Sequence, residues 1–244
     1  MVQSNAGDPP QGDLISLLLF LMCINPIIEY INQKGERYKL NKWMKINVLA
    51  YADDIVLIDS NRKEIEKTLK RLEKWMNTYG LTINHNKSAY THNYNKAVES
   101  IYVQNKEIPR IAKNESYLYL GKYLNIDLNW EKHERTMRAK FLWRLKLIKS
   151  KKLTMTQAVS IINIVANAYV IYAMDIYDFN SNTIKELDDK AAKLIKMKAG
   201  ISPKSGNVLL YAPLEQGGLG LIKLTDKMMT IKITGFFFFF YCCR

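Results

Sequence analysis

The chain has 244 residues, of which 48% are hydrophobic, so it can form one large globular domain or two small ones. Its formal net charge of +13 favours a polyanionic partner, with nucleic acid ahead of an acidic membrane surface. The cysteines Cys23, Cys242 and Cys243 include no C-x-x-C pair, which argues against a disulfide framework and a zinc site. We therefore expect an intracellular, reducing compartment.

The amino-terminal region is expected to begin with a disordered start and continue as a buried helix. Residues 1–10 contain glycine and proline but no basic cluster, so they are not a secretory signal. The apolar run at 14–24 predicts a helix capped by Asp13. This run is too short to span a bilayer, and Asn25-Pro26 is expected to end the helix.

Residues 48–58 place Asp53 and Asp54 between two apolar, β-branched runs. The pattern predicts a hairpin with residues 51–54 at its tip. Because adjacent strand residues point to opposite faces, we expect only one carboxylate to project fully into a shared site. Like charges this close either raise one pKa or recruit a cation, and Mg²⁺ takes oxygen ligands of this kind. A plain polar turn explains the same residues, since Asp is common in turns.

The region after the hairpin predicts one helix and then further strands. Ser60-Asn61 and Glu64 form a helix-start pattern, an apolar stripe at helical spacing follows, and Gly80 is placed to end the helix. The basic residues of this helix are expected to form its solvated face. Residues 101–111 and 117–128 are strand-like, with Gly121 marking a turn.

A basic block covers residues 131–152, where nine Lys or Arg residues stand against two Glu. Its apolar residues recur at helical spacing and predict a buried stripe; they are Met137, Phe141, Leu145 and Ile148. A solvated amphipathic face would account for the charges. Charge of one sign is nevertheless costly without a partner, and phosphate contacts would neutralise it. We therefore favour a nucleic-acid surface.

The carboxyl-terminal part is expected to be helical and then irregular. Residues 156–177 are apolar and long enough to suggest a membrane span, but Asn163 and Asn167 favour a central bundle helix. We therefore expect no transmembrane segment and no membrane partner. Residues 184–199 form a second amphipathic pattern that Gly200 ends. The five consecutive phenylalanines at 236–240 look unlike folded sequence.

Several segments resemble reverse transcriptases. Tyr51-Ala52-Asp53-Asp54 resembles the family's Tyr-x-Asp-Asp signature. Upstream, residues 11–20 (QGDLISLLLF) resemble its Gln-Gly-Asp-x-x-Ser-x-x-Leu-Phe segment. Downstream, GLTIN at 80–84 with Lys87-Ser88 resembles a Gly-Leu-x-x-Asn…Lys segment, and Tyr119-Leu120-Gly121 resembles the primer-gripping turn. Residues 212–221 (APLEQGGLGL) are similar to a segment that follows the thumb in LINE-type retroelements, those without long terminal repeats.

The resemblance implies an α+β fold. Residues 11–128 would be a partial right-hand polymerase palm, an antiparallel sheet backed by helices. Residues 129–200 would be a helical thumb, 201–235 a segment after the thumb, and 236–244 a low-complexity tail.

The resemblance also implies template-directed DNA synthesis on an RNA template with a DNA primer, using two Mg²⁺ or Mn²⁺ ions. Asp53 would be the principal metal ligand with Asp54 supporting, and Lys87 would protonate the leaving pyrophosphate. The remaining roles fall on three groups. Contacts to nucleotide and template would come from Gln11, Gly12, Ser16 and Tyr51; the primer grip from Leu120 and Gly121; and contacts to the nucleic-acid backbone from Arg138, Lys140, Arg144 and Lys146. No specific protein partner is implied.

Two departures from the family pattern qualify this reading. Pro10, Leu14 and Leu17 stand where the family usually has Arg, Pro and Pro. The mechanism also needs a further Asp several dozen residues before Gln11, and only ten residues precede it. We therefore expect a truncated piece that by itself holds no metal tightly and makes no DNA. The alternative to the enzyme is an inert retroelement remnant with residual, sequence-independent nucleic-acid binding.

Overall fold

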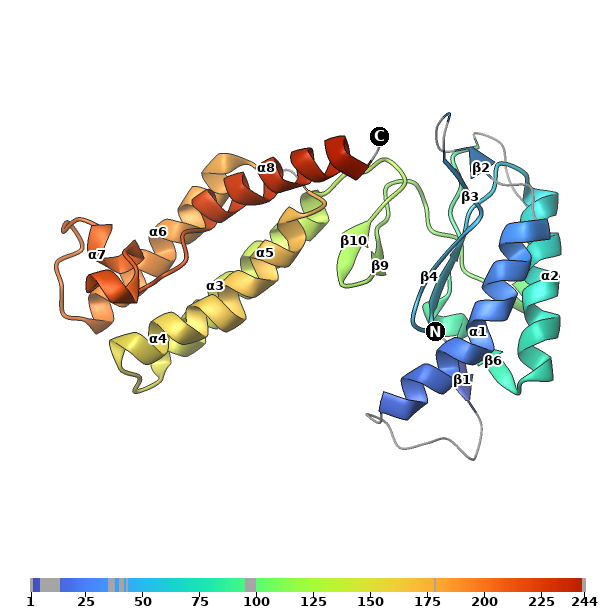
Figure 1. The fold of residues 1–244 in the computed structure, drawn as a ribbon, viewed down its shortest axis with the longest axis horizontal. Helices are drawn as coiled ribbons and strands as arrows, with labels where there is room; N and C mark the ends of the chain where they lie inside the picture. Colours follow the sequence, from blue (N-terminus) through green and yellow to red (C-terminus); the bar gives the residue numbers. More distant parts are fainter. Residues whose placement is uncertain are drawn as a thin grey trace. The chain divides into compact units, whose positions relative to one another are not determined.

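The computed structural model describes residues 2–4, 14–34, 38–39, 42, 44–94, 100–177 and 179–242. The chain divides into two compact units, Met1–Glu115 and Ser116–Arg244, which are described separately (Figure 1). Helices and short antiparallel strand pairs occur together, in agreement with the predicted α+β class.

The first unit combines two long helices with four two-stranded antiparallel pairs, β1–β6, β2–β3, β4–β5 and β7–β8. Its elements in chain order are β1 (Val2–Ser4), α1 (Leu14–Lys34), β2 (Tyr38–Lys39), β3 (Lys45–Ile46), β4 (Val48–Tyr51), β5 (Asp54–Leu57), α2 (Arg62–Thr78), β6 (Leu81–Ile83), the short 3₁₀ helix η1 (His85–Lys87), β7 (Ile101–Val103) and β8 (Lys106–Ile108).

The core of this unit lies where α1 and α2 meet the β4–β5 hairpin. It contains Ile24, Ile27, Ile31, Val48, Leu72, Met76 and Leu81. Two side-chain hydrogen bonds to α1 carbonyls fix the arrangement. The indole Nε1 of Trp75 donates to Cys23 O at 3.1 Å, and Asn47 Nδ2 donates to Ile31 O at 2.6 Å. The base of the hairpin is therefore tied directly to α1.

Helix α1 corrects the expectation that Asn25-Pro26 ends it, because the helix continues through Pro26 to Lys34. A proline inside a helix removes one backbone hydrogen bond. Ile24, Ile27 and Ile31 are nevertheless buried on both sides of Pro26, whose own side chain is exposed. Burial of this shared face outweighs the loss of the bond. The cap expected from Asp13 lies outside the residues that the structure describes.

Helix α2 begins and ends as predicted. The Asn61 side chain accepts a hydrogen bond from Lys63 N at 3.0 Å, satisfying a donor of the first turn. The helix ends at Thr78, and Gly80 follows with φ of +66°, a left-handed conformation that glycine adopts without strain.

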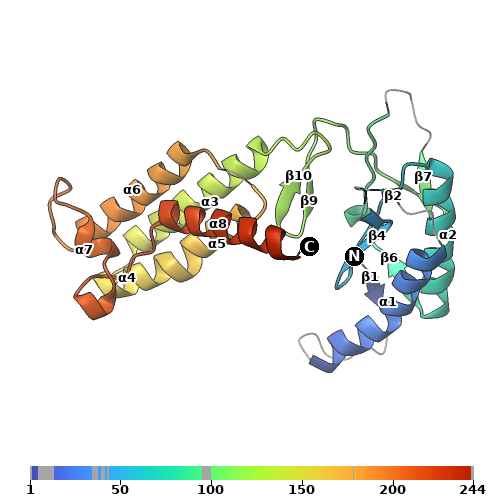
Figure 2. The same cartoon turned by 45° about the horizontal axis from the view of Figure 1, so that its top comes forward.

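The second unit is a helical bundle that carries one hairpin (Figure 2). Its elements are β9 (Tyr117–Tyr119), β10 (Lys122–Leu124), α3 (Glu131–Ser150), α4 (Met155–Ile161), the π-helical η2 (Ile162–Asn167), α5 (Ala168–Met174), α6 (Ser181–Lys198), α7 (Val208–Tyr211), the 3₁₀ helix η3 (Leu214–Gln216) and α8 (Leu224–Cys242). The predicted stripe of α3 is confirmed, because Met137, Phe141, Leu145 and Ile148 are all buried.

The stretch Met155–Met174 is long and apolar enough to cross a membrane by length and composition alone. It supplies seven buried residues to the bundle core: Ala158, Val159, Ile162, Ala166, Val170, Ala173 and Met174. Its asparagines bond to the backbone that precedes α8. Asn163 Nδ2 donates to Gly220 O at 2.9 Å, and Asn167 Nδ2 donates to Ile222 O at 3.1 Å. The predicted bundle helix is confirmed.

The backbone preceding α8 is tightly packed at Gly218. A Cβ built there would lie 2.1 Å from Ala212 O, so only glycine fits. Gly217 and Gly220 have φ of +75° and +64°. The segment 212–221 therefore folds back on itself and is held against the helix by Asn163.

Helix α8 starts on a carboxylate from α6. The buried Asp188 accepts hydrogen bonds from Leu224 N at 2.7 Å and from Thr225 N at 3.0 Å, which satisfies the free donors of the first turn. From this start the helical backbone runs to Cys242. The backbone of residues 236–242 continues this helix, and the low-complexity tail at 236–244 stays a prediction.

The two compact units meet between Glu115 and Ser116, and the palm–thumb boundary at 128/129 stays a prediction. The β9–β10 hairpin thus belongs to the helical unit. Tyr123 N donates to His133 Nδ1 of α3 at 3.3 Å, and Tyr172 Oη of α5 donates to Leu120 O at 2.9 Å. A strand-like pattern does not reveal which neighbour a hairpin packs against.

His133 makes the stability of the second unit depend on pH. Its side chain is only 2% exposed, and burial lowers its pKa, with Lys122 and Lys140 adding to the effect. In the unfolded chain His133 takes up a proton below its ordinary pKa of 6.5, whereas the folded chain resists it. The stabilisation is therefore complete above pH 6.5 and is lost as pH falls through the lowered pKa.

We expect the helical thermal transition to fall in temperature between pH 7.5 and pH 5.5, and His133→Gln to reduce this fall. Circular dichroism at both pH values measures it. An unchanged pH dependence in His133→Gln would show that other groups are responsible.

Candidate active-site hairpin and basic helix

The β4–β5 hairpin closes through a two-residue turn, as predicted. Tyr51 pairs with Asp54, and Ala52 and Asp53 form the turn between them. Ala52 has φ of +49°, a left-handed conformation that costs energy for any residue with a side chain. Strain of this kind persists where the surrounding structure fixes it, and it is frequent at functional sites.

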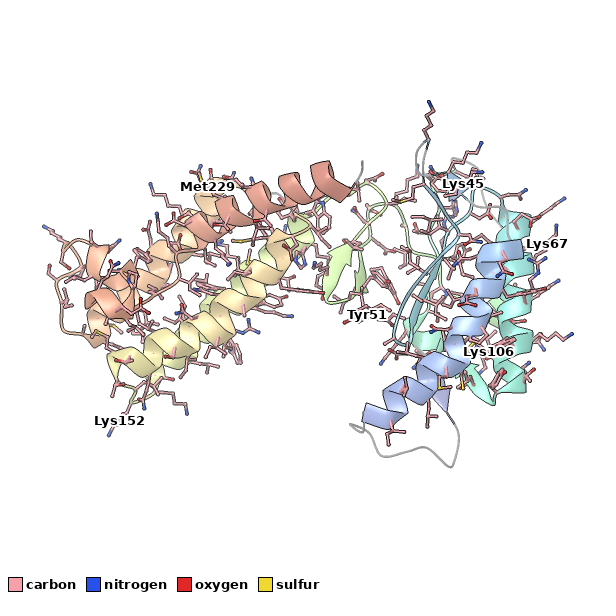
Figure 3. All side chains as sticks on the ribbon, in the orientation of Figure 1. Lys45, Tyr51, Lys67, Lys106, Lys152 and Met229 are labelled. Atoms are coloured by element: carbon pink, nitrogen blue, oxygen red, sulfur yellow. The ribbon has the colours of Figure 1, made fainter. Side chains whose placement is uncertain are left out.

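The strand register separates the two faces of the hairpin. Alternation places Val48, Ile55 and Leu57 on one face, and this face packs into the core. Tyr51 and Asp54 share the other face, where Tyr51 is 66% exposed at the end of the hairpin (Figure 3). Asp53 lies in the turn and belongs to neither face. Strand alternation therefore does not decide between the carboxylates, which are both half-buried.

The donor set at this turn fits a hard divalent cation. Asp53 and Asp54 supply adjacent carboxylates, and no salt bridge among the described residues engages either one. The described part of the chain holds no cluster of three or more His, Cys, Asp or Glu side chains. A Mg²⁺ ion here would complete its coordination with water and phosphate oxygens, as it usually does.

The other predicted residues of the first unit are placed as follows. Lys87 is the last residue of η1, which contacts β8, and its side chain is exposed. Ser16 lies half-buried near the start of α1. Gln11 and Gly12 lie outside the described residues. Their assigned roles stay predictions.

The predicted grip residues Leu120 and Gly121 are the two central residues of the β9–β10 turn. Their φ angles are +46° and +76°, as a type I′ turn requires. Tyr172 and Lys122 surround this turn and were not identified from the sequence. Lys122 Nζ lies 4.1 Å from the centre of the Tyr172 ring. The only sequence signal was the spacing of Tyr169 and Tyr172 on one helix face.

The cations of α3 differ in their surroundings. Arg138 forms an ion pair with Glu186 at 2.8 Å; this hydrogen bond raises the pKa of Arg138 and lowers that of Glu186. Arg144 donates to Val165 O at 3.0 Å and lies 4.8 Å from the Tyr169 ring centre, and Lys140 lies 5.0 Å from the same ring. Within the described interactions Lys146 has no partner, and it is exposed.

Apolar side chains are also exposed on α3 and on the neighbouring η2. Trp143 is 60% and Ile164 is 73% exposed, on α3 and η2, which contact each other. Cations and aromatic rings on one surface suit a nucleic acid, because cations contact phosphates and rings stack on bases. Tyr169 was not identified from the sequence as part of this surface.

Residues 8–142 match the family described as reverse transcriptase (RNA-dependent DNA polymerase). This is more than half of the chain, and it includes the carboxylate hairpin, the Leu120–Gly121 turn and the first part of α3. The chain therefore belongs to the reverse transcriptase family.

The chain is also similar to retrovirus-related Pol polyproteins from the type-1 retrotransposable element R2 of Popillia japonica. One is 23% identical over 195 residues, covering 75% of this chain and 39% of the relative. A second is 21% identical over 234 residues, covering 91% and 37%. The chain thus spans about two fifths of the length of these relatives. The predicted resemblance to LINE-type reverse transcriptases is confirmed.

The hairpin gives a first prediction about metal binding. Mn²⁺ added to the ¹⁵N-labelled chain is expected to broaden the backbone amide signals of Tyr51, Ala52, Asp53 and Asp54 before others, because two adjacent residues of this turn carry carboxylates. The double variant Asp53→Asn/Asp54→Asn should remove this local broadening.

Asp59→Asn is the matched control, because Asp59 lies at the other end of the hairpin and its Oδ1 accepts from Asn61 N at 2.8 Å. Broadening that persists in the double variant, or that Asp59→Asn removes equally, would contradict a metal site at the turn.

Proposed function

We propose that the chain supplies the metal-binding palm hairpin and the thumb of an RNA-directed DNA polymerase. The observation that carries this proposal is the turn at Asp53 and Asp54, which lies within the reverse transcriptase match and leaves both carboxylates outside any described ion pair. RNA template and DNA primer are the partners that this function requires.

Each residue contributes a distinct role in this proposal. Asp53 and Asp54 would hold Mg²⁺, which when bound supplies Lewis-acid stabilisation of phosphate oxygens. The exposed ring of Tyr51, on the same face as Asp54, would support the incoming nucleotide. Lys87 would donate a proton to the leaving pyrophosphate, a role that suits an exposed ammonium.

The cations of α3 would hold the nucleic-acid backbone. Lys140, Arg144 and Lys146 lie on the helix surface, and two of them flank the Tyr169 ring. Arg138 is occupied by Glu186, so it would have to exchange that partner for a phosphate. An exposed ion pair of this kind contributes little stability, so exchanging Glu186 for a phosphate costs little free energy.

A second candidate function is nucleic-acid binding without synthesis. It is favoured by the exposed cations Arg135, Lys146 and Lys149, for which the described interactions include no acidic partner. Such binding would be largely indifferent to sequence, because phosphate contacts carry no base information.

The first candidate is tested in a hybrid in which residues 8–142 replace the matching stretch of an R2 Pol polyprotein. We expect Asp53→Asn to lower primer extension on an RNA template with Mg²⁺ by more than about a hundredfold, since a metal ligand supports several kcal/mol of transition-state stabilisation. Asp54→Asn should lower it less.

Asp59→Asn in the same hybrid should leave extension unchanged. Equal losses for Asp53→Asn and Asp54→Asn would refute Asp53 as the principal ligand. Extension that survives both substitutions would refute the hairpin as the catalytic site and leave the second candidate.

The role of α3 is tested by replacing Arg138, Lys140, Arg144 and Lys146 with Gln in the full chain. Each phosphate contact contributes roughly 0.7 to 0.9 to the slope of log affinity against log salt. With Arg138 partly occupied, we expect the slope to fall by roughly 2 to 3 and the affinity for an RNA–DNA hybrid to fall with it.

A variant with the same change in net charge serves as the control. Lys63, Lys67, Lys70 and Lys74 are exposed on α2, and Lys67 extends away from the first unit (Figure 3). Replacing these four with Gln should change the slope little. Equal changes for the two variants would mean that binding follows net charge rather than the α3 surface.

A further inference from the structure

The β9–β10 turn is attached to the helices of its own unit at three points. Tyr172 Oη donates to Leu120 O at 2.9 Å, and Lys122 Nζ lies 4.1 Å from the centre of the Tyr172 ring. On the other side, Tyr123 N donates to His133 Nδ1 at 3.3 Å. Both α5 and α3 therefore hold a hairpin of only two short strands.

The hydrogen bond from Tyr172 fixes a specific peptide plane. The carbonyl of Leu120 and the N–H of Gly121 belong to the same peptide group, and all described peptide bonds are trans. In a trans peptide these two groups point in opposite directions. Since Tyr172 holds the carbonyl, the Gly121 N–H must point away from Tyr172.

The Gly121 N–H is also available to a ligand. In a two-residue hairpin the ladder is closed by the flanking pair, here Tyr119 and Lys122. None of the described hydrogen bonds uses the Gly121 N–H, and Gly121 is exposed. The N–H can therefore donate to an oxygen of a ligand.

The turn needs support because Leu120 is strained. Its φ of +46° lies in the left-handed region that a branched side chain disfavours. Such a conformation persists only where neighbouring groups hold it. Tyr172 is the residue that bonds to the strained residue itself.

The ammonium group of Lys122 lies over the face of the Tyr172 ring. Its side chain is only 6% exposed, and burial lowers its pKa, while Asp175 acts in the opposite direction. A buried ammonium is costly unless something stabilises it. The face of the Tyr172 ring provides that stabilisation. The same contact keeps the ring next to the turn.

We propose that Tyr172 and Lys122 are positioning residues that aim the Gly121 N–H at an oxygen of the sugar–phosphate backbone at the primer 3′ end. This inference rests on the proposed function. Tyr172 of α5 thereby fixes the orientation of a peptide group in a turn that lies some fifty positions earlier in the sequence. The ligand is an acceptor oxygen because a backbone N–H can only donate.

The test compares recognition of the primer terminus with binding of duplex. The full chain is titrated with an RNA–DNA hybrid that carries 2-aminopurine either at a recessed primer 3′ end or at an internal position. We expect tighter binding, reported by fluorescence, when a recessed end is present than with a blunt hybrid. Tyr172→Phe should lower this terminus preference by about threefold to tenfold, the usual effect of one hydrogen bond.

Tyr172→Phe should leave the affinity for the blunt hybrid unchanged. If the hydroxyl had a purely structural role, its loss would not be confined to the preference for a recessed end. Lys122→Met keeps the aliphatic stem, removes the cation from the ring and should lower the preference in the same direction. Circular dichroism establishes that both variants remain folded.

Tyr94→Phe is the matched control. Tyr94 is 48% exposed against 50% for Tyr172, and its hydroxyl also donates to a backbone carbonyl, that of Ser60. It should leave the preference unchanged.

The outcomes separate the inference from the function on which it rests. A parent chain without any preference for a recessed end would overturn the inference, whereas the proposed function is decided by primer extension in the R2 hybrid. A parent with the preference, retained in Tyr172→Phe as in Tyr94→Phe, would overturn the positioning role alone.

Discussion

Val48, Ile55 and Leu57 bury one face of the β4–β5 hairpin against α1 and α2, and this burial decides where the carboxylates stand. Val48 is buried and Ile55 and Leu57 are partly buried, so Val48 contributes close to the roughly 1.5 to 3 kcal/mol of full burial and the other two contribute less. The left-handed Ala52 costs on the order of 1 to 3 kcal/mol. Three apolar contacts thus hold the strained turn, and a slip of one residue would turn the whole apolar set toward solvent. The position of Asp54 beside Tyr51 follows from this register.

Side-chain hydrogen bonds to the backbone hold the helical unit together, in addition to its apolar core. Asp188 starts α8, and Asn163 and Asn167 bind the backbone that leads to it. Each side chain satisfies backbone groups that would be costly to bury alone. These hydrogen bonds join segments far apart in sequence. They therefore fix how the helices are arranged within the unit rather than the intrinsic stability of each helix.

The sequence predicted local features well, because short-range patterns carry them. The hairpin at 51–54, the start of α2 at Asn61 and the buried stripe at Met137 and Phe141 all depend on neighbours within a few positions. Pro26 misled the prediction because long-range burial outweighed a local helix breaker. The unit boundary and the roles of Tyr172 and Lys122 depend on contacts such as Tyr172 to Leu120, which no local periodicity encodes.

The glycine-rich segment before α8 has a further consequence. Gly218 sits so close to Ala212 that no side chain fits, while Asn163 bonds to Gly220 and Ile222. The motif that helps to identify LINE-type relatives is therefore a packing requirement of the bundle. Its presence reports ancestry and a well-formed helical unit. Because this segment and the carboxylate hairpin lie in different units, an intact glycine-rich segment shows that the bundle can pack and carries no information on the chemistry of the hairpin.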